Sequence, residues 1–223
     1  MTPLVLTFEE LMNAGIPALY ETLIMVSISS VGTVLLGLPL GVLLYISQPS
    51  GIAPNPFLAK GLGAVVNATR SVPYAILMLS LIPLTRLIVG SSVGPLAACV
   101  SLIIAAVPFF ARLVETSLRE VHPGKVDAAH AMGSTRMQTV TKVLLPEALP
   151  SLVASVTTTV VALIGYSAMA GLIGGGGLGR MAYNYGFQRF DSLVMIIIVL
   201  VLLGMVQLIQ VLGDTVTRRV DHR

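Results

Sequence analysis

The sequence predicts an all-α integral membrane protein with five transmembrane helices. Of its 223 residues, 55% are hydrophobic and 10% are charged, and the mean hydropathy is +0.92. A soluble domain carries about 25% charged residues. The apolar residues form long runs, each able to supply a helix that crosses about 30 Å of hydrocarbon. The charged residues gather between these runs.

The five expected spans are residues 16–47, 61–83, 93–110, 149–173 and 192–212. The first would form a helix of about 48 Å, so it must tilt, protrude or bend. Gly37 and Gly41, with Pro39 between them, mark either a bend or a GxxxG contact with another helix. Between the second and third spans, the chain is expected to reverse at residues 90–95, which contain two glycines and a proline.

The ends of the chain are expected to lie outside the transmembrane domain. Residues 1–15 are interpreted as an external surface helix in which Thr7 and Glu10 fit a capping box, with a frayed terminus as the alternative. The predicted organisation is an N-terminal segment (1–15), a transmembrane domain (16–213) with a polar insert (111–148), and a basic tail (214–223).

The distribution of Lys and Arg predicts the orientation. With the N-terminus outside, nine of the 13 basic residues lie in segments that face the cytoplasm and three lie outside, while Arg70 falls within the second span. Because cytoplasmic loops carry an excess of Lys and Arg, this orientation is favoured. It places the insert between spans three and four, and the C-terminus, in the cytoplasm.

The insert is organised around residues 127–146, DAAHAMGSTRMQTVTKVLLP. A first helix is expected over residues 125–132, and Gly133 suits the left-handed conformation that ends a helix. A second helix is expected to begin at Thr135, where Gln138 completes a capping box. The insert therefore predicts two short helices joined by a glycine turn.

The first of these helices is rich in small residues. Ala128, Ala129 and Ala131 lack bulk, so this short helix could enter a groove of a partner protein. The alternative is an amphipathic hairpin that lies on the membrane surface. Composition alone leaves both interpretations open.

The spacing of the insert resembles the Glu-Ala-Ala motif of ABC importer permeases, whose pattern is EAA, three residues, Gly, nine residues and Ile-x-Leu-Pro. The matching residues are Asp127, Ala128, Ala129, Gly133, Val143, Leu145 and Pro146. Asp replaces Glu and Val replaces Ile, so neither the charge nor the bulk is lost. In that family the loop forms coupling helices that dock on an ATP-binding subunit, and the resemblance implies this role here.

The resemblance extends over most of the chain. Residues 70–90, 105–115 and 163–179 are similar to the methionine importer permeases in particular. This implies a type I five-span core, a permease homodimer, two ATP-binding subunits, an external substrate-binding lipoprotein and a place in the bacterial cytoplasmic (inner) membrane. The implied substrate is methionine, in the L-form and as a candidate also the D-form. The alternatives are another amino acid or a small peptide, or a passive channel or secondary transporter.

The sequence predicts no catalytic activity in this chain. The phosphate-binding pattern GxxxxGK[ST] does not occur, so ATP and Mg²⁺ are expected to bind to a partner subunit. Gly174, Gly176 and Gly179 match GxGxxG, but they follow a membrane span where a dinucleotide site requires a strand. A re-entrant turn or close packing explains them better. The three histidines lack metal-site spacing, and neither a metal, another cofactor nor nucleic acid is expected to bind.

Polar groups at membrane depth are candidates for a translocation path because burying them in lipid is costly. The candidates are Asn67, Arg70 and Ser71 in the second span and Tyr166, Ser167 and Met169 in the fourth. Arg70 could instead extend to the cytoplasmic interface, and a hydroxyl could bond within its own helix. Met169 suits a thioether substrate, but methionine is also a common filler of gaps between helices.

Overall fold

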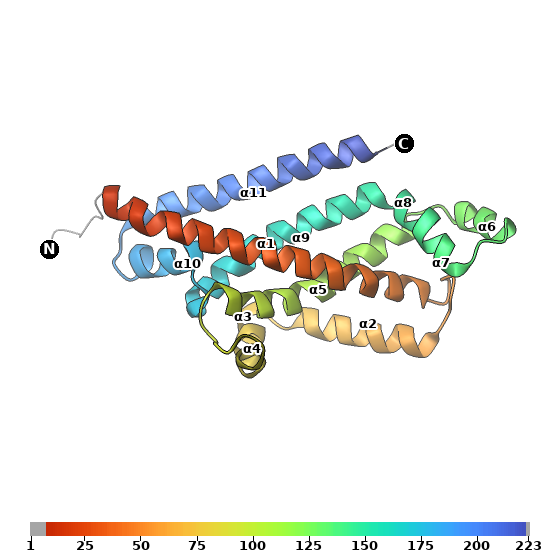
Figure 1. Ribbon diagram of the computed structural model, residues 1–223, viewed down its shortest axis with the longest axis horizontal. Helices are drawn as coiled ribbons and strands as arrows, with labels where there is room; N and C mark the ends of the chain where they lie inside the picture. The colour runs from red at the N-terminus through yellow and green to blue at the C-terminus, as the bar shows by residue number, and fades with distance from the viewer. Residues whose placement is uncertain (1–7, 222–223) are drawn as a thin grey trace. The chain divides into compact units, whose positions relative to one another are not determined.

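The computed structural model describes residues 8–221, and within that range every regular element is a helix (Figure 1). The α-helices are α1 (Phe8–Ile46), α2 (Pro56–Ser71), α3 (Tyr74–Ser80), α4 (Ile82–Val89), α5 (Pro95–Arg119), α6 (Pro123–Ala131), α7 (Arg136–Thr139), α8 (Leu145–Glu147), α9 (Leu149–Ala170), α10 (Gly177–Met181) and α11 (Ser192–Val220). Three π-helical segments connect them: η1 (Val140–Leu144), η2 (Gly171–Gly175) and η3 (Ala182–Phe187). The predicted all-α class is confirmed.

Among the described residues, four helices are long and apolar enough to cross a membrane: α1, α5, α9 together with η2, and α11. The pair α2 and α3 passes the same test jointly, as a bent pair, which raises the number to five. α1 continues without a break across the predicted boundary at residue 15. Thr7 lies outside the described residues, so the predicted capping box with Glu10 stays a prediction.

The third span is longer than predicted. α5 continues to Arg119, so residues 111–119 belong to a membrane-length helix and the insert begins after it. The prediction ended the span at Phe110, two residues before the first charged residue, Arg112. These charges are tolerated because they pair with one another: Arg112 and Arg119 both contact Glu115. α11 likewise continues to Val220 and includes most of the predicted tail.

The second span was predicted as one helix over residues 61–83, and this prediction is wrong. α2 ends at Ser71 and α3 begins at Tyr74, and a further short helix, α4, follows α3. Pro73 explains the break, because it has no N–H to donate and disfavours helical geometry in the residue before it. Its own backbone is extended, with φ −56° and ψ 135°.

The chain forms two compact units, each assembled from separate segments. Unit 1 comprises Met1–Gly32, Val72–Ala105 and Val160–Gln210, of which residues 1–7 are not described. Unit 2 comprises Thr33–Ser71, Ala106–Thr159 and Val211–Arg223, of which residues 222–223 are not described. The helices α1, α5, α9 and α11 contribute residues to both units.

In unit 1, the N-terminal part of α1 packs on α10 and α11. A buried core contains Ala18, Leu178, Met181, Val194 and Ile198. α1 also satisfies the first backbone N–H groups of α10, which have no partner within that helix. The N–H of Gly177 donates to Oε2 of Glu21 at 2.6 Å, and the N–H of Leu178 donates to Oγ1 of Thr22 at 2.9 Å.

In unit 2, the C-terminal part of α1 packs closely on α5. A Cβ atom on Gly37 would lie 2.8 Å from Cδ1 of Phe110, and one on Gly41 would lie 2.5 Å from Cβ of Val114. α1 continues as a helix through Pro39. The structure therefore supports the packing interpretation of the GxxxG pair, since side chains at these two positions would separate the helices.

Candidate functional site

The predicted loop forms a well-defined helical structure in unit 2. α6 begins with Pro123 at a position where a missing N–H costs nothing. α6 ends at Ala131, and Gly133 in the following turn has a φ of +79°, the left-handed conformation that was predicted. The N–H of Gly133 donates to the carbonyl of His130 at 2.9 Å, and the N–H of Ser134 donates to that of Ala129 at 3.1 Å. These two bonds make a Schellman motif, which gives the turn one defined geometry.

The second half of the loop begins with the predicted capping box. The N–H of Gln138 donates to Oγ1 of Thr135 at 3.3 Å, and the N–H of Thr135 donates to Oε1 of Gln138 at 2.8 Å. α7 then passes into the π-helix η1, which contains Val143, and into α8, which contains Leu145 and Pro146. The seven motif residues thus occupy α6, its glycine turn and η1–α8, and α6 packs against η1.

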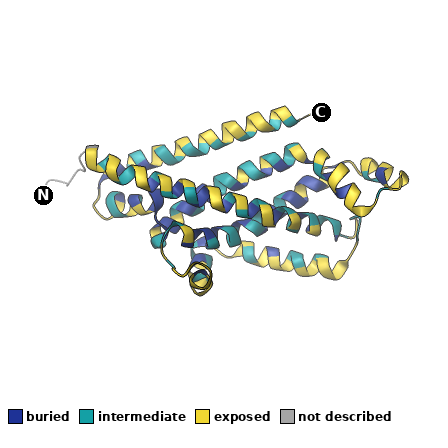
Figure 2. Cartoon of the chain, in the orientation of Figure 1, coloured by how far each residue is buried: buried dark blue, intermediate teal, exposed yellow. Residues whose placement is uncertain are grey.

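Most residues of α6 and α7 are exposed. Figure 2 shows α6 and α7 mostly in yellow, the colour of exposed residues. Met132 and Met137 are 79% and 71% exposed, although methionine is apolar. Asp127 and Ala128 are also exposed, whereas Ala129 is buried. The expectation that Ala129 is presented to a partner is therefore corrected: it packs inward, and the exposed face is formed by its neighbours.

The loop is anchored to the long helices of unit 2 at several points. Nζ of Lys125 on α6 pairs with Oε2 of Glu147 on α8. The apolar side of the loop joins a single buried core with α5 and α9, which contains Phe110, Val114, Leu118, Val121, Val140, Leu144, Ala148 and Leu152. Val126 of α6 packs against this core. Because packed interiors are nearly incompressible, a force on α6 is passed directly to α5 and α9 within this unit.

An apolar groove of about 550 Å³ lies beside α7 in unit 2. One wall is formed by Leu38 and Val42 of α1, and the other by Met137, Val140 and Leu145 of the loop. Met137 and Leu145 therefore have apolar surroundings on one side.

Three of the predicted path residues lie on α2, in unit 2. Oδ1 of Asn67 accepts a hydrogen bond from Nη2 of Arg112 at 3.0 Å. Arg70 places its guanidinium carbon 6.0 Å from the centre of the Phe109 ring, and Oγ of Ser71 donates to the carbonyl of Asn67 at 2.9 Å. Each of these polar groups thus has a partner within the chain, and all three residues are exposed.

The other three path candidates lie on α9, in unit 1. The ring of Tyr166 stacks on that of Tyr74 with centres 4.9 Å apart. Oγ of Ser167 is buried and donates to the carbonyl of Ile164 at 2.8 Å, so this hydroxyl bonds within its own helix, as the alternative interpretation held. Met169 is exposed.

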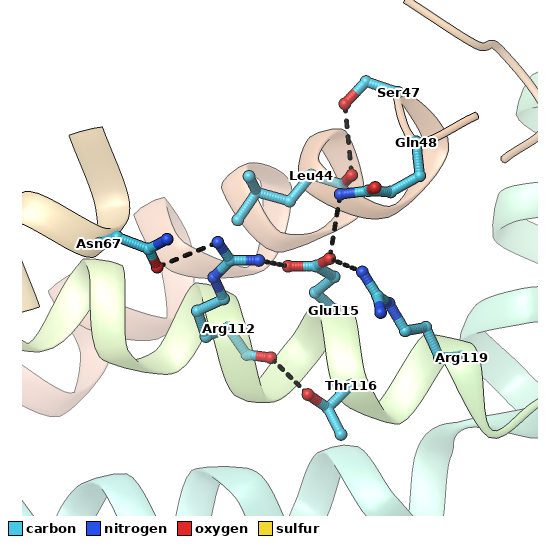
Figure 3. A network of polar contacts seen from close by, with 8 residues as sticks. All are labelled: Leu44, Ser47, Gln48, Asn67, Arg112, Glu115, Thr116 and Arg119. Atoms are coloured by element: carbon cyan, nitrogen blue, oxygen red, sulfur yellow. Dashed lines mark hydrogen bonds and ion pairs between the residues drawn. The ribbon is translucent and has the colours of Figure 1, made fainter. Parts of the chain in front are cut away.

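Sequence reasoning missed one cluster of polar side chains (Figure 3). Glu115 on α5 is only 2% exposed, and its carboxylate contacts Arg112, Arg119 and Gln48. The signal was present in the sequence: arginines three residues before and four residues after a glutamate lie on one side of a helix and pair with it. The two arginines were counted only for the orientation of the chain.

The sequence matches a known family over most of its length. Residues 37–223 match the family described as "Binding-protein-dependent transport system inner membrane component". The chain belongs to this family. It is a permease of the ABC importer class and a multi-pass protein of the bacterial inner membrane.

The relatives and solved structures are more specific. The chain is 52% identical to the probable D-methionine transport system permease protein MetI of Vibrio cholerae serotype O1, over 92% of each chain. It is 45% identical to the protein of the same name from Pasteurella multocida, over 91% of this chain and 94% of that one. Among solved structures, an inward-facing conformation of the MetNI methionine ABC transporter is 45% identical to this chain. The match covers 97% of this chain and 100% of the solved chain, with a TM-score of 0.95.

Proposed function

We propose that this chain is the membrane permease of an ATP-driven importer of methionine, with L-methionine and D-methionine as its substrates. The assignment of methionine as the substrate rests on two relatives, at 52% and 45% identity, that are both named as probable D-methionine permeases. The solved structure at a TM-score of 0.95 is named as a methionine transporter. Substrate is delivered by an external binding lipoprotein.

The chain works as a homodimer with two ATP-binding subunits, which hold ATP and Mg²⁺. The solved relative is named as a complex, MetNI, which supports such an assembly. Asp127, Ala128 and Gly133 form the surface that docks on the ATP-binding subunit, because they lie on the exposed side of a loop that is anchored to α5 and α9. Val143, Leu145 and Pro146 hold this surface in place from η1 and α8.

Within the path, Tyr166 and Met169 are the candidates best suited to a thioether substrate. Tyr166 is partly exposed and is held by its stack on Tyr74, and Met169 is 39% exposed three residues later on the same helix. Aromatic rings and sulfur atoms attract one another. Asn67, Arg70 and Ser71 already have partners in the chain, so we assign them a supporting role on α2.

The proposed orientation has the N-terminus outside and the docking loop in the cytoplasm. Met132→Cys places a thiol at an exposed position, and the natural cysteine, Cys99, is buried. A membrane-impermeant maleimide is expected to label Met132→Cys in inside-out vesicles and not in right-side-out vesicles. Adding the ATP-binding subunit should lower that labelling.

Gln188→Cys is the matched control for orientation. Gln188 is exposed and lies between η3 and α11, in a segment assigned to the outer side. Its labelling should show the opposite pattern, in right-side-out vesicles only. Labelling of Met132→Cys from the outside would contradict the proposed orientation.

Uptake of labelled methionine tests the function directly. The chain and its ATP-binding subunit are reconstituted in vesicles with the binding lipoprotein, and methionine is expected to accumulate only with ATP present. Methionine flux through the purified chain without any ATP-binding subunit would favour the passive channel. Accumulation of another amino acid in place of methionine would support the assignment as an importer and contradict the assignment of methionine as its substrate.

A further inference from the structure

We infer that Glu115 is a positioning residue that joins the loop-bearing end of α5 to α1 and α2, so that motion of the docking surface reaches both helices. This inference rests on the proposed function and names a residue through which it operates. All groups involved lie in unit 2.

The carboxylate of Glu115 is held from three sides. Nη1 of Arg112 donates to Oε2 at 2.5 Å, and Nη2 of Arg119 donates to Oε1 at 2.5 Å. Nε2 of Gln48, two residues beyond the end of α1, donates to Oε1 at 3.3 Å. Burying a charged group is costly unless it is paired and hydrogen-bonded, and these three side chains supply such contacts.

The network then continues from α5 to α2. Arg112 contacts Glu115 through Nη1 and Asn67 through Nη2, as Figure 3 shows. The bond from Nη2 to Oδ1 of Asn67 is 3.0 Å long. Arg112 therefore bridges the carboxylate and α2. Gln48 and Asn67 are far from Glu115 in the sequence, so these contacts tie two other segments to α5, the first directly and the second through Arg112.

The same part of α5 supports the docking loop. Three residues separate the end of α5 at Arg119 from the start of α6 at Pro123, and one of them, Val121, is buried in the core that also contains Val140 and Leu144. A displacement of α6 must therefore move the end of α5. In this inference, the apolar face of α5 moves together with the core that it shares with the loop. Glu115, on the polar face of α5, passes the displacement to α1 and α2.

Charge distinguishes this role from packing alone. The Arg119 side chain is 55% exposed and that of Arg112 is 24% exposed, so both can reach water if the carboxylate is neutralised. Glu115→Gln keeps the shape and volume of the side chain. It weakens the contacts that cross between helices while the apolar core of α5 stays intact.

The test measures the ratio of methionine uptake to ATP hydrolysis in the reconstituted complex. Glu115→Gln is expected to assemble with its ATP-binding subunit and to hydrolyse ATP, while uptake per ATP falls by about tenfold. Glu115→Asp should recover part of the ratio because it restores the charge. A merely structural loss would lower uptake and hydrolysis together and leave the ratio unchanged.

The matched control is Glu120→Gln, which neutralises an exposed glutamate immediately after α5 and should keep the wild-type ratio. Gln48→Ala removes the contact to the end of α1, and Asn67→Ala removes the contact to α2. Neither variant changes a charged residue. Each is expected to lower uptake per ATP by about threefold, so the inference is decided even if Glu115→Gln does not fold. Wild-type ratios in both variants would overturn it, whereas absence of ATP-driven uptake in the wild-type complex would instead reject the proposed function.

Discussion

Gly133→Arg is expected to lower ATP-driven uptake at least about tenfold, the factor that corresponds to a loss of about 1.4 kcal/mol of docking free energy. Apart from its two neighbours in sequence, no described residue has an atom within 4 Å of a Cβ atom at Gly133, so this atom has open space around it. It extends from the turn into the proposed docking surface instead. The measurements are uptake in vesicles and co-purification of the ATP-binding subunit, and both should fall.

The left-handed conformation of Gly133 introduces a second effect that must be separated from bulk. For a residue with a Cβ atom, this left-handed conformation costs roughly 1–2 kcal/mol of conformational free energy. Gly90→Arg is the matched control, since Gly90 ends α4 with φ +80° and also has open space around it. Gly133→Asn adds little strain, because asparagine adopts left-handed geometry readily.

Gly90→Arg and Gly133→Asn are therefore expected to keep most of the uptake activity. Equal losses in Gly133→Arg and Gly90→Arg would mean that strain, and not docking, explains the effect. Unchanged uptake and co-purification in Gly133→Arg would show that the loop does not dock on the ATP-binding subunit.

Features of the loop that depend on a few consecutive residues were predictable from the sequence. The capping box needs only Thr135 and Gln138, and the left-handed turn needs only Gly133 after a short helical segment. Both are satisfied within a single turn of helix, so no distant part of the chain decides them. The burial of Ala129 was not predictable, because it depends on how α6 packs against η1.

The end of α5 was predicted wrongly because the cost of a charge depends on its partners. Arg112 and Glu115 would be costly in lipid if each stood alone. Their mutual contact, and the contacts to Gln48 and Asn67, offset part of that cost. The spacing on α5 could have suggested the contacts within the helix, but the contacts to α1 and α2 require the folded chain.

The candidates for the translocation path could be named from the sequence, but the residues that each of them contacts could not be predicted. The stack of Tyr166 on Tyr74 joins residues that are 92 positions apart in the chain. Ser167, by contrast, has its partner at Ile164, within one turn. A hydrogen bond within its own helix was therefore the safer prediction for the Ser167 hydroxyl. The contact of the Tyr166 ring depends on how the chain folds, so it could not be predicted from the sequence.

Gly179→Ala is expected to destabilise the permease by more than about 3 kcal/mol, beyond the usual range for an added methyl group in a packed core. In unit 1, a Cβ atom at Gly179 would lie 2.0 Å from the carbonyl oxygen of Ala168, 2.7 Å from its carbonyl carbon and 2.8 Å from its Cα atom. All three atoms belong to the backbone of α9, so no side chain can rotate away. The change can be accommodated only if α10 moves away from α9.

Such a movement would also break the contacts that hold α10 from its other side. Gly177 and Leu178 donate their N–H groups to Glu21 and Thr22 of α1, and these bonds depend on the position of α10. On the scale for chains of this size, a loss of about 3 kcal/mol lowers the midpoint of thermal unfolding by roughly 6–12 °C. Melting of the detergent-solubilised protein, followed by size-exclusion chromatography, measures that shift.

Gly165→Ala provides the matched control, since it makes the same substitution in α9 at a position where a Cβ atom meets nothing within 4 Å. It is expected to leave the melting temperature unchanged or to raise it slightly, because alanine restricts the unfolded chain by about 0.4–1 kcal/mol. If Gly179→Ala melts like Gly165→Ala, the glycines of residues 171–179 serve flexibility. A large difference between the two variants means that they serve the close approach of α9 and α10, since an ordinary flexible turn would accept a methyl group.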